Sequence, residues 1–290
     1  MIKIIIRRFF TAIKIFLYKL LDPLYILLDK KNVRRTKSIS LIPSSFNRRG
    51  GTYSYAEWAQ VIGIFQTLMY IHLQNKKNNK ILDVGSGCGL LLNSSRQFIE
   101  PNGEYIGIDV VKDEINFCNS HYPKKYKFEH ADALNPYYSS NQNDKLKWSY
   151  KDSTFDLVTA LSVWTHLNEK DAFFYMGEVN RVLKPGGKAF ISFFILDELY
   201  DKFILNMSNE KPKYHLLTQK QYIYDQKAYG SSEWFYPKWT SIPERAIGVK
   251  KKGFDKLIIE NGMKLVEHYQ GNWKENPGVF FQDILILEKK

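Results

Sequence analysis

The most constraining feature of this 290-residue sequence is an apolar run that ends in an acid and opens into a turn with glycine at every second position. It reads KILDVGSGCG, residues 80–89, with glycines at Gly85, Gly87 and Gly89. Glycine has no Cβ, so such a turn brings bare backbone close to a ligand. Asp109 ends the next strand-like run about 20 residues later, where a carboxylate can accept hydrogen bonds from a ribose diol. The pattern predicts a nucleoside-binding site at a strand-to-helix turn.

Strand-like and helical segments alternate from this turn onward. Helices are expected over 53–74, 90–99, 112–122, 169–183 and 254–261, and strands over 80–84, 104–110, 125–132, 155–163, 187–195, 263–271 and 279–290. Apolar strands covered by helices on both faces are typical of a parallel sheet. The last two strands follow each other closely. The sequence therefore predicts a doubly wound, mostly parallel, seven-stranded α/β sheet that ends in an antiparallel hairpin.

Cysteine content and charge limit the classes of protein to which this chain can belong. Only Cys88 and Cys118 are present, which gives no disulfide framework and no zinc-ligand spacing, so a reducing, cytoplasmic compartment fits. The formal net charge of +12 suits an anionic partner such as a membrane surface, a phosphorylated substrate or nucleic acid. The alternative is a basic solvated surface, because the lysines are spread along the chain.

The N-terminal segment 1–31 has the pattern of an amphipathic basic helix. Its apolar residues recur at helical spacing, at Ile2, Ile6, Phe9, Phe10, Ile13, Phe16, Leu17, Leu20, Leu21 and Leu24. Its cations fall on the other side, at Lys3, Arg7, Arg8, Lys14 and Lys19. Cations interrupt every stretch long enough to span a bilayer, and no cleavage site of a signal peptide follows. We expect this helix to lie on an anionic membrane, at the inner face; packing on its own domain or a second subunit is the alternative.

Five segments of the core resemble the motifs of class I S-adenosylmethionine-dependent methyltransferases. They are LDVGSGCG (82–89), YIGIDV (105–110), HADAL (130–134), FDLVTALSVWTHL (155–167) and EVNRVLKPGGKAFIS (178–192). Together they cover about residues 80–195. Dinucleotide-binding folds prefer G-x-G-x-x-G, whereas this turn reads G-x-G-x-G after Asp83. A nicotinamide-dependent oxidoreductase of similar sheet topology is therefore the less favoured alternative.

The resemblance implies S-adenosyl-L-methionine as cofactor and a set of residues that bind it. Asp83 would lie near the methionine ammonium, Asp109 would hold the ribose hydroxyls, and Asp132 would accept from the adenine amine. For Asp132 a helix cap is the alternative, and for Leu161 a place in the core. The whole implied set is Asp83, Gly85, Ser86, Gly87, Gly89, Asp109, Val110, Asp132, Ala133 and Leu161.

Methyl transfer to a hydroxyl requires a base, and the candidate is His166, just beyond the fourth predicted strand. The alternative is that His166 is a structural histidine that hydrogen-bonds the next helix. For Trp164 the two interpretations are a place in the pocket wall and a place in the core. The chemistry requires no metal, and we expect none.

The resemblance and the chain's organisation together define the expected domains. Residues 1–41 would be the basic helix and linker, and 42–290 the methyltransferase domain, with its cofactor-binding core at about 80–195. Residues 196–250 form an aromatic-rich insertion, interpreted as a lid or as a small core, before the terminal helix and hairpin at 251–290. Arg48 and Arg49 could bind a carboxylate or phosphate or belong to an ordinary basic loop.

The expected function is O-methylation of a small, glycan or lipid-linked acceptor at a membrane surface. Methylation of nitrogen, including nucleic acid, is an alternative. It is disfavoured because ALSVW (160–164) stands where adenine amino-methyltransferases carry an Asn or Asp, Pro, Pro, Tyr or Phe motif. NPYY (135–138) follows the third predicted strand instead and is discounted.

Overall fold

The protein is described from a computed structural model, which covers residues 2–48, 53–138, 145–208 and 211–290. Its centre is a seven-stranded sheet of order β10-β11-β5-β4-β1-β2-β3. The strands are β1 (Lys80–Val84), β2 (Glu104–Asp109), β3 (Lys127–His130), β4 (Phe155–Ala160), β5 (Leu183–Phe193), β10 (Met263–Tyr269) and β11 (Asp283–Lys289). β1 to β5 pair in parallel, and β11 is antiparallel to both β5 and β10. The predicted doubly wound sheet with an antiparallel end is confirmed.

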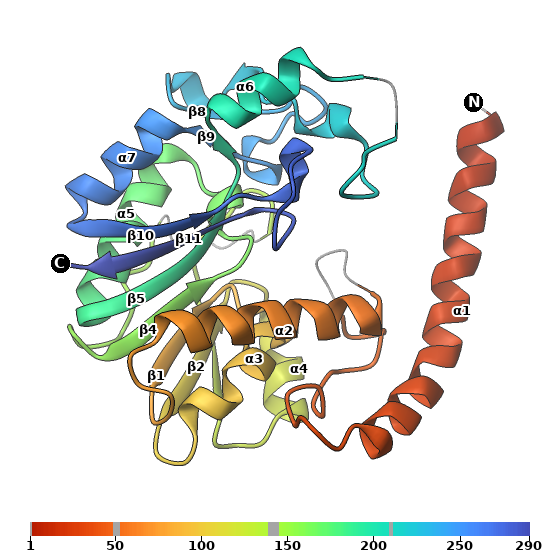
Figure 1. The fold of residues 1–290 in the computed structure, drawn as a ribbon, viewed down its shortest axis with the longest axis vertical. Coiled ribbons are helices and arrows are strands. Elements are labelled where there is room, and N and C mark those ends of the chain that lie inside the picture. The colour runs from red at the N-terminus through yellow and green to blue at the C-terminus, as the bar shows by residue number, and fades with distance from the viewer. Residues whose placement is uncertain (1, 49–52, 139–144, 209–210) are drawn as a thin grey trace.

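Helices cover both faces of this sheet (Figure 1). The helices on one face are α2 (Tyr55–His72), α3 (Leu90–Ile99) and α4 (Lys112–His121), and on the other α5 (Glu169–Val182) and α7 (Lys251–Glu260). Phe65 of α2 and Leu91 of α3 share one apolar cluster, while Met176 of α5 and Leu257 of α7 share another. The apolar face of each helix is thus buried against strands that are apolar on both sides, as the sequence pattern requires.

The insertion after β5 folds into a second, four-stranded sheet of order β6-β9-β8-β7. Its elements are β6 (Ile195–Leu196), α6 (Glu198–Leu205), η2 (Gln219–Tyr222), β7 (Gln226–Lys227), η3 (Ala228–Gly230), β8 (Trp234–Tyr236), η4 (Pro243–Arg245) and β9 (Gly248–Lys250). Tyr200, Tyr224 and Trp234 are buried in it. These three aromatic residues therefore belong to packed cores.

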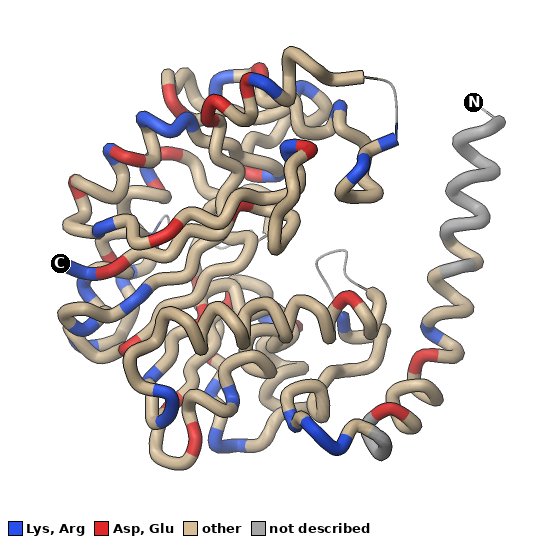
Figure 2. Tube along the Cα trace, viewed as in Figure 1, with Lys and Arg blue, Asp and Glu red and all other residues tan. Residues whose placement is uncertain are grey.

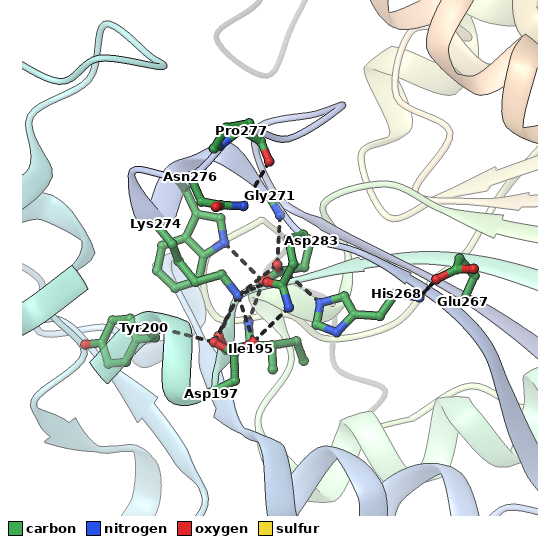
Figure 3. Close-up of polar contacts among 12 residues, drawn as sticks. Ile195, Asp197, Tyr200, Glu267, His268, Gly271, Lys274, Asn276, Pro277 and Asp283 are labelled. Carbon is green, nitrogen blue, oxygen red and sulfur yellow. Dashed lines mark hydrogen bonds and ion pairs between the residues drawn. The ribbon is translucent and has the colours of Figure 1, made fainter. Parts of the chain in front are cut away.

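A buried charge cluster fastens this small sheet to the terminal hairpin (Figure 3). Lys274, at the end of η5 (Asn272–Lys274), places its Nζ 3.0 Å from Asp283 Oδ1 and 3.1 Å from Asp197 Oδ2. Asp283 Oδ2 also accepts from the backbone N of Ile195 at 2.9 Å. Burial raises the pKa of Asp283, but the His268 hydrogen bond and the Lys274 charge outweigh it, so the pKa lies below its ordinary value. Lys274 and Asp283 are both inaccessible and Asp197 is 15% exposed, so the cluster joins core and insertion at a mostly buried place.

Helix α1 (Ile2–Asn32) stands apart from the rest of the chain and is fastened near its C-terminal end (Figure 1). Asp22 of α1 and Arg48 form a buried ion pair, with 2.7 Å between Arg48 Nη2 and Asp22 Oδ2. Arg48 also donates to the carbonyl oxygens of Pro43 and Tyr53, at 2.9 and 2.5 Å. The interpretation of Arg48 as a binder of an external anion is therefore wrong for this structure, because its guanidinium is used within the chain. Arg49 lies outside the described residues.

Lys and Arg are scattered over the described chain, as Figure 2 shows, which fits the alternative of a generally basic surface. Among the helices of the described ranges, none combines the length and the apolar character needed to cross a membrane.

Candidate active site

A cavity of about 1290 Å³ opens at the carboxyl ends of β1, β2 and β4. Ligands of doubly wound folds bind at this edge of the sheet. Ligand pockets usually measure about 300–1,000 Å³, so this cavity has room for more than one small molecule. We call its lining at the strand ends the strand-tip wall, which consists of Asp83, Val84, Gly85, Ser86, Gly87, Asp109, Val110 and Leu161.

The glycine turn is held against the end of β2. The backbone N–H groups of Gly85 and Ser86 both donate to the carbonyl oxygen of Ile108, at 2.8 and 3.0 Å. Gly85 and Gly87 have φ of +68° and +50°, which favour glycine. A Cβ at Gly85 would lie 2.4 Å from Val163 Cγ2. At this position the fold itself requires glycine, in addition to any need of a ligand.

The remaining predicted residues fall in two groups. Ala133, like Val110 and Leu161, lines the cavity. Gly89 caps α3 with φ of +81°, and a Cβ there would lie 2.5 Å from the ring of Tyr122; it is not among the described lining residues. Asp132 is exposed and is also outside that lining, although Ala133 beside it belongs to it. Roles for Gly89 and Asp132 in binding stay predictions.

Asp83 is the most deeply buried carboxyl group of the strand-tip wall. Its Oδ2 accepts from Tyr105 Oη at 2.6 Å, and its Oδ1 accepts from Thr159 Oγ1 at 2.8 Å. Burial raises its pKa to about 7, against the opposing effect of these two hydrogen bonds. Asp83 thus sits near the midpoint of its titration at neutral pH, where a cationic neighbour would favour its ionised form.

Asp109 faces the same cavity from the end of β2. Its Oδ2 accepts from the backbone N of Gly87 at 2.8 Å, and its Oδ1 accepts from that of Val111 at 2.9 Å. Burial raises the pKa of Asp109, and these backbone donors partly offset the rise. Each oxygen keeps a further lone pair, so the carboxylate is oriented and can still accept from a diol.

His166 lies at the end of η1 (Trp164–His166), directly after β4, and lines the cavity. Its Nδ1 is 2.7 Å from the carbonyl oxygen of Glu244. Because a carbonyl only accepts, Nδ1 carries the proton, and Nε2 of the neutral ring is left as the acceptor. Nε2 lies 3.3 Å from Tyr138 Oη. Burial lowers the pKa of His166, so the ring is neutral at pH 7.

Two parts of the cavity were missed or discounted at the sequence level. The segment NPYY contributes Asn135 and Tyr138 to the lining, and Asn135 Nδ2 donates to the carbonyl oxygen of His166 at 3.1 Å. β11 begins at Asp283 instead of 279, because residues 279–282 turn away from the ladder and line the cavity. The aromatic residues of both segments were the available signal.

The insertion and the loop before β11 supply another side of the cavity. We call this side the aromatic wall; it consists of Tyr214, Tyr222, Trp239, Phe280 and Phe281, together with Arg245. The insertion therefore forms a small core and also lines the cavity. Trp164, which is 1% exposed, likewise belongs to both core and lining.

Comparison with known proteins identifies the family. Residues 75–236, more than half of the chain, match the model of a methyltransferase domain. A sterol 24-C-methyltransferase of Schizosaccharomyces pombe is 26% identical over 153 residues, which are 52% of this chain and 37% of that protein. One from Kluyveromyces lactis is 30% identical over 127 residues, 44% of this chain and 31% of that protein. The match therefore spans about a third of the length of these curated relatives.

Solved structures agree at the level of the fold. A putative sarcosine dimethylglycine methyltransferase from Galdieria sulphuraria has a TM-score of 0.52 at 10% identity, covering 82% of this chain and 88% of its own. Magnesium protoporphyrin IX methyltransferase from Synechocystis, solved with bound SAH, has a TM-score of 0.50 at 12% identity, covering 85% and 91%. With the glycine turn and the two carboxyl groups in one cavity, the chain belongs to the methyltransferase-domain family.

Proposed function

We propose that this enzyme methylates a hydroxyl oxygen of a small, glycan or lipid-linked acceptor at a membrane surface. When bound, S-adenosylmethionine supplies a methyl group activated by a cationic sulfur. The strand-tip wall suits such a ligand because Asp83 and Asp109 are its charged groups and both are carboxyl groups. The observation that carries the proposal is the acceptor nitrogen of His166 in the same cavity as this wall.

The strand-tip wall would bind the cofactor through few side chains. Asp109 would accept from the ribose hydroxyls, and Asp83 would attract the ammonium of the methionine moiety. The turn at Gly85 and Gly87 would leave space for that moiety, and Val110 would flank the adenine. All of these residues line the one cavity, which supports a shared role.

His166 would remove the proton of the acceptor hydroxyl at Nε2. The Glu244 carbonyl holds the proton at Nδ1, so Nε2 is the nitrogen that can take another. A neutral ring is needed for this step, and burial, which lowers the pKa of His166, favours that form. Tyr138 Oη, 3.3 Å from Nε2, occupies the side from which a hydroxyl would approach.

The proposal is tested with His166→Ala in a labelled-methyl transfer assay over lipid and sugar extracts. Loss of a general base typically costs about 10²–10⁴ in rate, so we expect a fall in kcat of that size with unchanged affinity for S-adenosylhomocysteine. The exposed His121→Ala is the control and should keep full activity. Full activity of His166→Ala would rule out the proposed base.

The pH dependence gives a second measurement. Protonated His166 cannot act as a base, and burial lowers its pKa, so kcat of the natural enzyme should fall only at a pH under the ordinary histidine value of about 6.5. The rate that remains in His166→Ala should lack this acid limb. An unchanged limb in the variant would assign it to another group.

The acceptor side supports an apolar or amphiphilic acceptor. Aromatic faces bind rings, sugars and apolar chains, and the aromatic wall offers several. The relatives named as sterol 24-C-methyltransferases act, by name, on a lipid, which is consistent with such an acceptor here. We propose that α1 brings the enzyme to the membrane, because Phe16, Leu20 and Leu24 are each 60–65% exposed.

Vesicle flotation tests the membrane part. Deletion of residues 1–31 would remove Asp22 and leave Arg48 buried without its carboxylate, so point substitutions are the better variants. The triple variant Phe16→Ser, Leu20→Ser and Leu24→Ser should lose flotation with vesicles of phosphatidylglycerol and phosphatidylcholine, because each apolar side chain loses about 1.5–3 kcal/mol of burial. Equal flotation of both proteins, or none of the natural chain, would contradict a membrane role for α1.

A further inference from the structure

The charged groups that line the cavity are mostly acidic. The carboxylates are Glu57, Asp83, Asp109 and Glu114, whereas Arg245 is the one Lys or Arg among the described lining residues. Arg245 belongs to the aromatic wall. The family's chemistry accounts for carboxylates next to a cationic cofactor, but it does not account for this cation.

The guanidinium of Arg245 lies over two aromatic rings. Its Cζ is 5.0 Å from the ring centroid of Trp239 and 5.9 Å from that of Tyr137. Trp239 is itself fixed, since its Nε1 donates to the carbonyl oxygen of Gln221 at 2.8 Å. Within the described residues the guanidinium has no carboxylate partner. The rings attract the cation through their faces, and its N–H donors make no hydrogen bond within the described residues, so they are available for a ligand.

Arg245 is held at a fixed place relative to His166. The residue before it, Glu244, accepts the His166 Nδ1 hydrogen bond at its carbonyl, and Ile247 N donates to the carbonyl of Thr165 at 2.7 Å. The Glu244 carboxylate accepts from Tyr229 Oη at 2.8 Å. Hydrogen bonds between the segments of η1 and η4 thus hold the backbone at Arg245 in place relative to the candidate base, His166.

We propose that Arg245 binds an anionic group of the acceptor, a carboxylate or a phosphate, while the acceptor's apolar body lies on the aromatic wall. This inference rests on the proposed function and adds the acceptor's charge to it. A guanidinium binds either anion through two parallel N–H donors. The carboxylates of the strand-tip wall repel the same anion, so the acceptor is oriented with its charge away from the cofactor and a hydroxyl toward His166.

The experiment measures binding of simple probes to the full chain loaded with S-adenosylhomocysteine, by calorimetry. The probes are phenyl phosphate, benzoate, dodecyl phosphate, inorganic phosphate and neutral benzyl alcohol. Arg245→Gln should raise the Kd of phenyl phosphate or benzoate about 10- to 100-fold, the loss of a charged hydrogen-bonding partner, and leave that of benzyl alcohol unchanged. Arg245→Lys should keep part of the affinity, because it retains the charge but not the fork.

The matched control is Lys256→Gln, since Lys256 also lies over an aromatic ring, that of Phe173 at 5.7 Å, but is not among the lining residues. It should leave every Kd unchanged. Tighter binding of dodecyl phosphate than of phenyl phosphate indicates a lipid source of the anion, and the reverse order a soluble one.

Two results would overturn the inference. If Arg245→Gln and Lys256→Gln weakened the binding of phenyl phosphate equally, the effect would come from general surface charge. If inorganic phosphate bound as tightly as phenyl phosphate, the aromatic wall would contribute nothing to affinity. If His166→Ala kept full methyl-transfer activity, the proposed base would be wrong, but the effect of Arg245→Gln on the Kd of phenyl phosphate would still be expected. Failure of the proposed function and failure of the anion site are therefore distinguishable.

Discussion

The two walls of the cavity are built in different ways. The strand-tip wall consists of backbone and short side chains at the ends of β1, β2 and β4, and its hydrogen bonds run between neighbouring strands. The aromatic wall consists of long side chains from the insertion and from the loop before β11. The first wall follows once the sheet has formed. The second also requires the insertion to be held in place.

One group of contacts that holds it is the cluster of the buried Lys274 and Asp283 with the partly exposed Asp197. Asp283 belongs to the sheet, Asp197 caps α6, and Lys274 lies between them. A buried charge left without its partner is strongly destabilising. The difference between the walls therefore predicts that the aromatic wall can be disturbed through a residue that does not line the cavity.

The largest effect is expected from Lys274→Met. Removal of the cation leaves the inaccessible Asp283 carboxylate without its Lys274 partner, which should lower the free energy of unfolding by about 3–5 kcal/mol. Urea denaturation measures this loss. In the protein that remains folded, affinity for S-adenosylhomocysteine should be unchanged, whereas phenyl phosphate should bind more weakly. Lys264→Met, at an exposed position of β10, is the control.

A loss below about 1 kcal/mol, the range of a surface ion pair, would contradict the anchoring role of Lys274. Parallel loss of both ligands would show that the two walls are not separable.

An intermediate effect is expected from Asp109→Asn, which acts on the strand-tip wall alone. The amide offers one acceptor oxygen in place of the two that now bind Gly87 and Val111. Loss of a charged acceptor costs about 1.5–3 kcal/mol, so the Kd of S-adenosylhomocysteine should rise about 10- to 100-fold and phenyl phosphate binding should stay. Asp113→Asn, exposed on α4, should change neither value. An unchanged Kd in Asp109→Asn would remove this residue from the proposed site.

The same contrast explains what the sequence could predict. β1 and α3 have the predicted bounds, and Gly85 and Asp109 share the cavity as expected, because local periodicity and strand order determine both. Arg48 was misjudged because its partner Asp22 lies 26 residues away, and no local pattern pairs them. Arg245 was missed for the same reason, since its place depends on how η4 packs on η1.

The smallest effect, counted per unit of pH, is the change of stability and of S-adenosylhomocysteine affinity that follows from the titration of Asp83. Burial raises its pKa from 3.8 to about 7, so the folded protein binds the proton more tightly than the unfolded chain. The stability that this proton contributes is complete below about pH 4 and is lost as the pH rises through about 7.

A cationic ligand prefers the ionised carboxylate, so affinity for S-adenosylhomocysteine, through its ammonium, should change in the opposite sense to this stability. It should rise with pH by up to about tenfold per unit below pH 7 and then level off. Asp83→Asn should flatten this profile, whereas benzoate binding at the aromatic wall should be level from pH 6 to 8 in both proteins. Calorimetry at several pH values compares the two walls directly, because only one of them contains a carboxyl group that titrates near neutrality. A level profile for S-adenosylhomocysteine in the natural chain would mean that Asp83 does not face the ligand's cation.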